Sequence, residues 1–119
     1  MSETRTIQMA ETASKDGGLR FKYSRYAGAD GNWVRHGEFR AFYPDGTLAS
    51  EGSYVDGKEN GPWKDFHDNG KLAAEGAYAG GKEHGAWIYY ATDGSVEETI
   101  EYENGVEMKR PPRRARRAG

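Results

Sequence analysis

Two histidines are the residues whose spacing first suggests chemistry in this chain. His36 and His84 stand 48 residues apart, and Asn60 lies midway between them in an equivalent place. Histidine is a common metal ligand and proton carrier, but a metal needs ligands that converge on one point. Equivalent positions two strands apart in a sheet are separated by about 10 Å. We therefore interpret these residues as polar neighbours of structural glycines, and we predict no metal site.

Carboxylates are numerous, but their positions predict structural ion pairs rather than catalysis. Glu51 and Glu75 recur with the same spacing and are expected to face Arg40 and Lys64, opposite-charge pairs worth about 0.2–1 kcal/mol each. No Ser-His-Asp order, phosphate loop or His-Glu-x-x-His motif occurs. The chain has no cysteine, which excludes disulfides and thiolate metal sites. We expect a protein that is not an enzyme and binds no cofactor.

Basic residues are concentrated at the C-terminal end of the sequence. Residues 109–119 contain six of the 17 cations and no anion, which leaves 11 cations against 19 anions in residues 1–108. The six are Lys109, Arg110, Arg113, Arg114, Arg116 and Arg117. Such a segment is expected to be a flexible arm that can contact nucleic acid or an anionic membrane by charge. The alternative is a solvated arm that rests on the acidic body of the protein.

A repeat of 24 residues sets the positions of all these side chains. The segments HGEFRAFYPDG, NGPWKDFHDNG and HGAWIYYATDG begin at residues 36, 60 and 84, and 11 of 24 positions are identical between the first two copies. A fixed period of this length indicates a repeat architecture. The composition, with 17 Gly, 8 Tyr, 4 Phe and 3 Trp, favours short strands joined by glycine turns over a helical bundle.

Each copy contains two turn signals. They are Asp45-Gly46 and Asp56-Gly57, Asn69-Gly70 and Gly80-Gly81, and Asp93-Gly94 and Asn104-Gly105. Such pairs tolerate the positive φ angles of two-residue type I′ turns. The turns leave strands of about eight to ten residues, and strands near 18–27 and 32–44 fit before the regular copies. The pattern predicts a continuous antiparallel meander.

Two-residue turns also predict which residues face one another across each hairpin. Trp63 is expected opposite Gly76, and Phe39 opposite Gly52. Each large ring would then lie over a strand position that has no side chain. The sheet is therefore expected to be apolar and aromatic on one face.

A second set of aromatic residues is expected on the opposite, charged face. Aromatic residues three apart on a strand point to opposite faces, which places Phe42, Phe66 and Tyr90 there as a stripe. Ala49 and Ala73 are expected opposite the first two rings, so self-coverage is one interpretation of the stripe. The other is a protein-binding surface, because a single-layer sheet cannot bury both faces by itself. Residues 1–17, a second copy or another protein could supply the cover.

The repeated segments resemble MORN repeats, in the variant form common in bacterial antitoxin-like proteins of toxin–antitoxin systems. The residues that carry the resemblance are Gly61, Trp63, Phe66 and Gly70, then Leu72, Glu75, Gly76, Tyr78, Gly81 and Lys82, with the same pattern from Gly37 to Lys58. The third copy departs from it at Thr99, Ile100 and Val106. The resemblance covers about residues 20–108. It implies an antitoxin-like or assembly role, while other members are scaffold or membrane-associated proteins.

We thus predict an all-β protein, a single-layer twisted antiparallel meander of about seven or eight strands. Residues 1–17 are expected to be a partly disordered lead-in, residues 18–108 the sheet and residues 109–119 a basic tail. The expected function is non-catalytic protein binding in the cytoplasm through Phe42, Phe66 and Tyr90 or a sheet edge, and a homo-oligomer is compatible with it. The alternative is peripheral membrane or nucleic-acid association through the tail.

Overall fold

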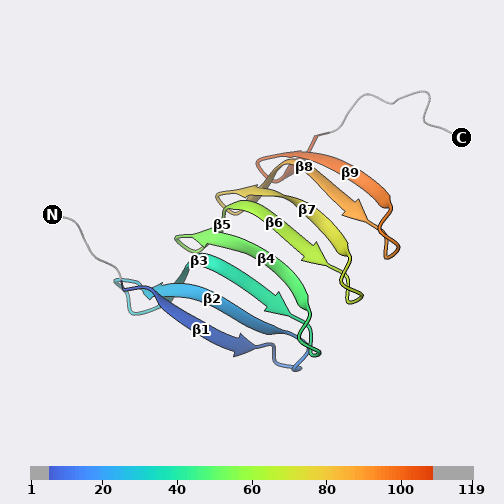
Figure 1. The fold of residues 1–119 in the computed structure, drawn as a ribbon. Coiled ribbons are helices and arrows are strands. Elements are labelled where there is room, and N and C mark those ends of the chain that lie inside the picture. Colours follow the sequence, from blue (N-terminus) through green and yellow to red (C-terminus); the bar gives the residue numbers. More distant parts are fainter. Residues whose placement is uncertain (1–5, 109–119) are drawn as a thin grey trace, which may run out of the picture.

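The computed structural model describes residues 6–108, and they form one antiparallel sheet with no helix (Figure 1). Its strands are β1 (Gln8–Ala13), β2 (Arg20–Ala27), β3 (Trp33–Phe42), β4 (Leu48–Val55), β5 (Lys58–Glu59), β6 (Gly61–Phe66), β7 (Leu72–Ala79), β8 (Lys82–Tyr90), β9 (Val96–Glu103) and β10 (Val106–Glu107). Neighbouring strands in the sheet follow one another along the chain, except that the short strand β5 and the strand β6 both pair with β4. The expectations for residues 1–5 and 109–119 lie outside the described residues.

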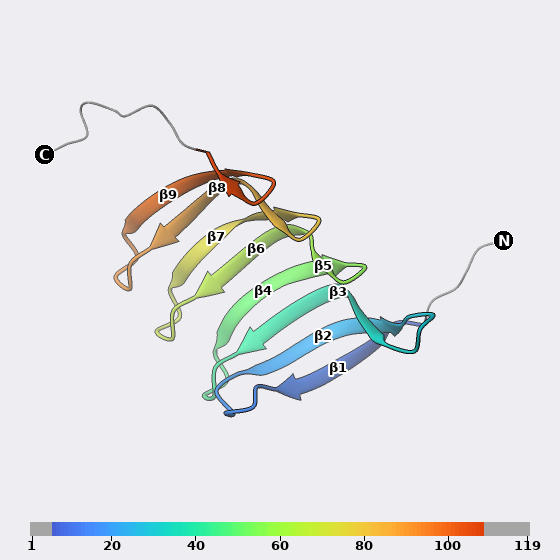
Figure 2. The ribbon, with the colours of Figure 1, turned by 180° about the vertical axis from the view of Figure 1, so that it is seen from behind.

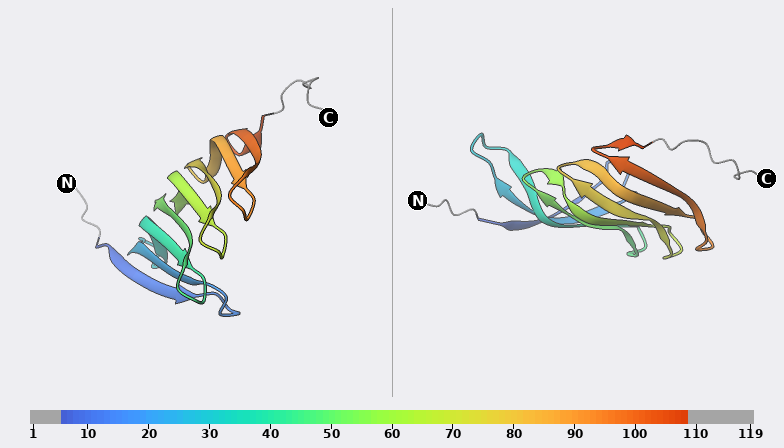
Figure 3. Two further views of the ribbon diagram at one scale, coloured as in Figure 1. Left: turned by 45° about the vertical axis from the view of Figure 1, so that its right-hand side comes forward. Right: turned by 90° about the horizontal axis from the view of Figure 1, so that it is seen from above.

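The strands lie side by side in one twisted layer, as the opposite views of Figures 1 and 2 and the turned views of Figure 3 show. The predicted fold class, an all-β meander built from repeated hairpins, is confirmed. The sheet has ten strands rather than seven or eight. The additional ones are β1 and the two-residue strands β5 and β10, which are too short to leave a pattern in the sequence.

The first strand starts earlier in the chain than predicted. Residues 8–13, which lie within the predicted lead-in, form β1 and pair with β2 from Gln8–Arg25 to Ala13–Arg20. Only Ala10 of this strand is buried and its one large apolar residue, Met9, is exposed, so the strand lacks the alternation that would have identified it in the sequence. The Ser14–Leu19 turn that joins the two strands is closed by a 2.9 Å hydrogen bond from Ser14 N to Leu19 O.

Three of the six predicted type I′ turns are confirmed, and three are wrong. At Asp56-Gly57, Gly80-Gly81 and Asn104-Gly105, both residues of the pair have positive φ. In the other three turns only the glycine does, and the loops are longer, spanning residues 43–47, 67–71 and 91–95. In each of these loops the Asp or Asn side chain accepts a hydrogen bond from the backbone N–H two residues later, which stabilises the wider turn.

The predicted pairing register of the strands is retained despite these longer turns. Trp63 pairs with Gly76 and Phe39 with Gly52, as expected. The additional loop residue is absorbed by a β-bulge next to each long turn, such as the shift between Asp65 and Phe66.

Large rings form a continuous row on one side of the sheet, which we call the aromatic face. Phe39 stacks on Trp63 at 5.5 Å between centroids, and Tyr78 packs edge-on against both Trp63 and Trp87 at 5.3 and 5.1 Å. Phe39, Trp63 and Trp87 are buried although no second layer covers them in the described chain. The rings therefore bury one another, which lets a single layer hold a core.

Candidate interaction surface

The stripe predicted from the sequence lies at one end of the repeated hairpins. Phe42, Phe66 and Tyr90 are the last residues of β3, β6 and β8, each immediately before a long turn. All three side chains are half-buried. They alternate with buried neighbours of the aromatic face, so they lie on the other side of the sheet, which we call the charged face.

The bulges give each stripe residue an aliphatic partner, whereas alanines were predicted opposite Phe42 and Phe66. Cα pairing joins Phe42 to Leu48, Phe66 to Leu72 and Tyr90 to Val96. The prediction that Ala49 and Ala73 face the rings is therefore wrong by one residue, because the bulge displaces the partner strand. We call these six paired residues the apolar band. Val96, at its C-terminal end, is 60% exposed.

Charged side chains surround the apolar band. Arg40 lies 3.7 Å from Glu51 and 3.5 Å from Glu38, in partly exposed ion pairs that contribute little to stability. The Tyr90 hydroxyl donates a 2.6 Å hydrogen bond to Glu75. This hydrogen bond raises the pKa of Tyr90, because ionisation would place a second negative charge beside the carboxylate. Tyr90 is thus held in one orientation on the surface.

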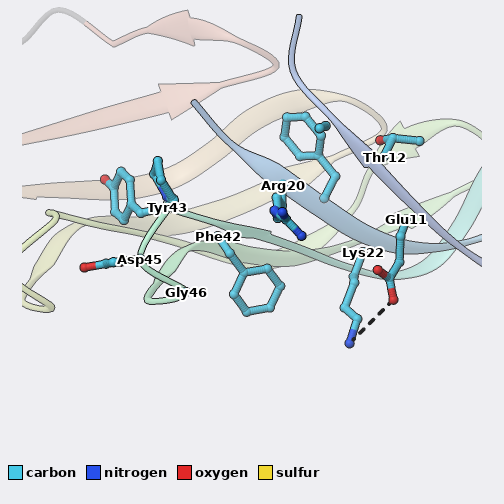
Figure 4. Close-up of a pocket in the computed structure, with 11 residues that line it drawn as sticks. Glu11, Thr12, Arg20, Lys22, Phe42, Tyr43, Asp45 and Gly46 are labelled. Atoms are coloured by element: carbon cyan, nitrogen blue, oxygen red, sulfur yellow. Dashed lines mark ion pairs between the residues drawn. The ribbon is translucent and has the colours of Figure 1, made fainter. Parts of the chain in front are cut away.

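An open hollow of about 720 Å³ lies at the N-terminal end of the band, around Phe42 (Figure 4). The ring of Phe42 and the side chain of Lys22 extend to the same side in the figure, and Lys22 lies 3.9 Å from Glu11. Arg20, the cross-strand partner of Phe42, also lines the hollow. The hollow therefore combines aromatic rings with two cations and two carboxylates, Glu11 and Asp45.

The aromatic face is less suited to form a broad apolar contact, because its rings already cover one another. Tyr78 illustrates this: burial, followed by the charges of Glu83 and Glu59, raises its pKa to about 12. Burial likewise raises the pKa of Tyr89, and its hydrogen bond to Tyr102 raises that pKa further. These phenols belong to the packed core of the sheet.

His36 and Asn60 occupy the same repeat position and have the same structural role. Nδ1 of His36 accepts a 3.0 Å hydrogen bond from Asp56 N, and the amide oxygen of Asn60 accepts the equivalent bond from Gly80 N at 3.3 Å. This repeat position therefore satisfies a backbone donor in the neighbouring turn. Within residues 6–108, no three His, Cys, Asp or Glu side chains are grouped to hold a metal ion.

Two residues that link successive repeats were missed in the sequence. The Tyr43 hydroxyl donates to the carbonyl oxygen of Phe66, and Nε2 of His67 lies 2.8 Å from the carbonyl oxygen of Tyr90. Tyr43 and His67 are 24 residues apart, and this spacing could have identified them. Both bonds end on carbonyls of stripe residues, so they help to position the apolar band.

The predicted contact residues of the tail lie outside the described part of the chain. In the part that is described, none of the secondary structure is a helix of the length and apolar character needed to cross a membrane. Because the tail residues are not described, membrane or nucleic-acid association through their charges stays a prediction.

A family model described as "MORN repeat variant" matches residues 35–56, 59–79 and 83–104. These three matches coincide with the three regular hairpin units and span more than half of the chain. No curated protein matches the chain, and no solved structure does.

Proposed function

The chain belongs to the MORN repeat variant family, and from that premise we propose that it is a non-catalytic protein-interaction module that binds through the apolar band. MORN repeats are generally protein or membrane interaction modules. The proposal commits to a protein partner that covers the charged face.

The observation that carries the proposal is the pairing of each stripe ring with an aliphatic side chain. Three such pairs repeat along the sheet, half-buried or exposed, and no second layer covers them within residues 6–108. Contiguous apolar surface rimmed by polar residues is typical of a protein contact. Aromatic side chains in such a patch provide most of the affinity.

The finer form of the proposal is an antitoxin-like or assembly subunit that forms a stoichiometric complex with its partner. An apolar contact of this kind should persist at high salt. Charge-driven binding of a membrane or nucleic acid through residues 109–119 should weaken steeply as salt increases. Salt dependence therefore separates the two modes of binding.

Affinity purification of the tagged full-length chain from its own host, at low and high salt, tests the proposal. We expect a stoichiometric protein that survives high salt and is lost in a Phe66→Ser/Tyr90→Ser variant. The matched control is Val55→Ser, since Val55 is an apolar residue 46% exposed at the opposite end of β4.

A second control removes residues 109–119 and should leave the complex intact. Retention of the partner by the Phe66→Ser/Tyr90→Ser variant would exclude the apolar band as the contact surface. Recovery of only lipid or nucleic acid, lost with high salt or with the tail, would assign the function to the tail instead.

A further inference from the structure

One cross-strand pair departs from the charge pattern of the repeats. Three tyrosine–glutamate pairs recur on the aromatic face where successive hairpins meet, Tyr54–Glu59, Tyr78–Glu83 and Tyr102–Glu107. On β2 and β3 the corresponding pair is Arg25 and Arg35. Arg35 stands 24 residues before Glu59, so the charge at this repeat position is reversed. Like charges directly opposite one another destabilise a sheet, so folding does not explain this pair.

Aromatic rings hold both guanidinium groups in place. The Cζ atom of Arg25 lies 3.8 Å from the ring centroid of Trp33, a side chain that is 49% exposed. The Cζ atom of Arg35 lies 4.6 Å from the ring of Tyr23, and its Nη1 donates to the Tyr54 hydroxyl at 3.3 Å. Stacking fixes the plane of a guanidinium while its N–H groups stay available to a ligand.

Neither arginine has a carboxylate partner within residues 6–108. The ion pairs in this part of the chain involve Lys22, His36 and Arg40 instead. The Nε atom of Arg25 is buried and has no hydrogen-bond acceptor there. Within residues 6–108, the one hydrogen bond shown for either guanidinium is that from Arg35 to Tyr54, and a buried unsatisfied donor such as Arg25 Nε is rare in a folded protein.

We propose that Arg25 and Arg35 form a binding site for a carboxylate of a partner peptide, with an adjacent apolar side chain of that peptide packed against Trp33. Each guanidinium offers paired N–H donors that match a carboxylate, and the two arginines are cross-strand partners on neighbouring strands. An open space of about 550 Å³ beside Arg35, lined by Trp33 and Tyr54, can admit the peptide.

The surrounding charge favours a single carboxylate over a polyanion. Glu59 and Asp56 line the same open space, and residues 1–108 carry 11 cations against 19 anions. Nucleic acid or an anionic membrane would bring many negative charges close to these groups, which costs free energy. A peptide can present one carboxylate to the arginines and neutral or basic groups to the rim.

This site is independent of the apolar band, because Arg35 stacks on rings of the aromatic face and the band lies on the charged face. A peptide bound at Arg25 and Arg35 and a protein bound to Phe66 and Tyr90 would contact opposite sides of the sheet. Failure of one proposal therefore leaves the other intact.

Nuclear magnetic resonance of the isotope-labelled full-length chain tests the site, using N-acetylphenylalanine as the carboxylate probe. We expect saturable shifts of the Arg25 and Arg35 side-chain signals with this probe. Its uncharged amide analogue should cause none, and inorganic phosphate should bind more weakly. A peptide-display selection on the same protein should enrich an Asp or Glu next to an aromatic or aliphatic residue.

The decisive variant is Arg25→Tyr/Arg35→Glu, which restores the pattern of the other three pairs. It should fold with equal or greater stability toward urea and lose at least about tenfold in probe affinity, the loss expected for one charged hydrogen-bonding pair. Arg40→Gln, which removes one cation from the charged face, should leave affinity unchanged.

If the double variant does not fold, Arg25→Gln/Arg35→Gln serves the same purpose. Unchanged probe affinity in a folded double variant, tighter binding of phosphate than of the carboxylate, or a display selection without acidic residues would each overturn the proposal.

Discussion

The indole ring of Trp63 lies over Gly52, in the strand before it, and not over Gly76, its partner in the strand after it. A Cβ atom added to Gly52 would come within 3.0 Å of three ring atoms of Trp63. Trp87 lies over Gly76 in the same way. Each large ring thus leans toward the preceding repeat, and this contact joins one hairpin to the one before it.

Gly52→Ala should therefore destabilise the protein by about 1–3 kcal/mol, the range for overpacking a filled core. The φ angle of Gly52 is not positive, so the cost comes from the collision with the ring and not from backbone strain. Urea unfolding followed by tryptophan fluorescence measures it. Gly18→Ala is the control, because its added carbon would meet only the flexible carboxylate of Asp16. Equal midpoints for the two variants would contradict this account of the packing.

The two faces of the sheet should respond differently to loss of an aromatic ring. Trp63→Ala removes a ring that is 8% exposed and should cost about 3–5 kcal/mol. Phe66→Ala removes a half-buried ring and should cost about 1–2 kcal/mol. Urea unfolding of both variants under one set of conditions gives the comparison. A larger loss for Phe66→Ala would mean that the charged face is part of the core and not a contact surface.

Stability should decrease in acid through the aspartates of the long turns. Hydrogen bonds from the backbone N–H and the hydroxyl of Thr47 lower the pKa of Asp45 below 3.8. Hydrogen bonds from the hydroxyl and the backbone N–H of Ser95 likewise lower the pKa of Asp93 below 3.8. A lowered folded-state pKa adds stability that is present above pH 3.8 and is lost as pH falls through the folded value.

Asp45→Asn/Asp93→Asn should reduce this acid sensitivity and retain the turns, because Asn69 accepts the same hydrogen bond in the middle repeat. Urea midpoints at neutral pH and near pH 3 test it. The expectation fails if the variant and the parent lose the same stability in acid.

Alkaline pH should destabilise the sheet through Tyr78. Its pKa is raised from 10.0 to about 12, mainly by burial. A raised folded-state pKa contributes stability below pH 10 that is lost as pH rises through 12. Tyr78→Phe should lower the dependence of the urea midpoint on pH in this window. A titration of tyrosinate absorbance should also show one fewer late-titrating phenol, and an unchanged titration would argue against the assignment.

The repeat and the register could be predicted because both depend on local spacing. Trp63 faces Gly76 whether the turn has two residues or a longer loop with a bulge, since the bulge restores the count. The bulge itself was not predicted, and with it the partner of Phe66 changed from Ala73 to Leu72. The Asp-Gly and Asn-Gly pairs are compatible with both turn types, and side-chain hydrogen bonds such as that from Thr47 N to Asp45 select the longer loop.

The first hairpins were harder to predict, because they break the period. The register shifts between Tyr23 and Arg25, so counting residues from a turn does not show that Arg25 faces Arg35. Strand β1 has small or exposed side chains, with Ala10 alone buried, and so lacked the alternation that identifies a strand.

By itself the sequence determined the strand order, the hairpin register and which aromatic residues share a face. These properties follow from turn positions and from the two-residue period of a strand, which act within one hairpin. Only the tertiary structure decided which glycine each indole covers, which aliphatic residue accompanies each stripe ring and which charges lack a partner. Those contacts join strands of different hairpins, and they depend on the bulges and twist of the whole sheet.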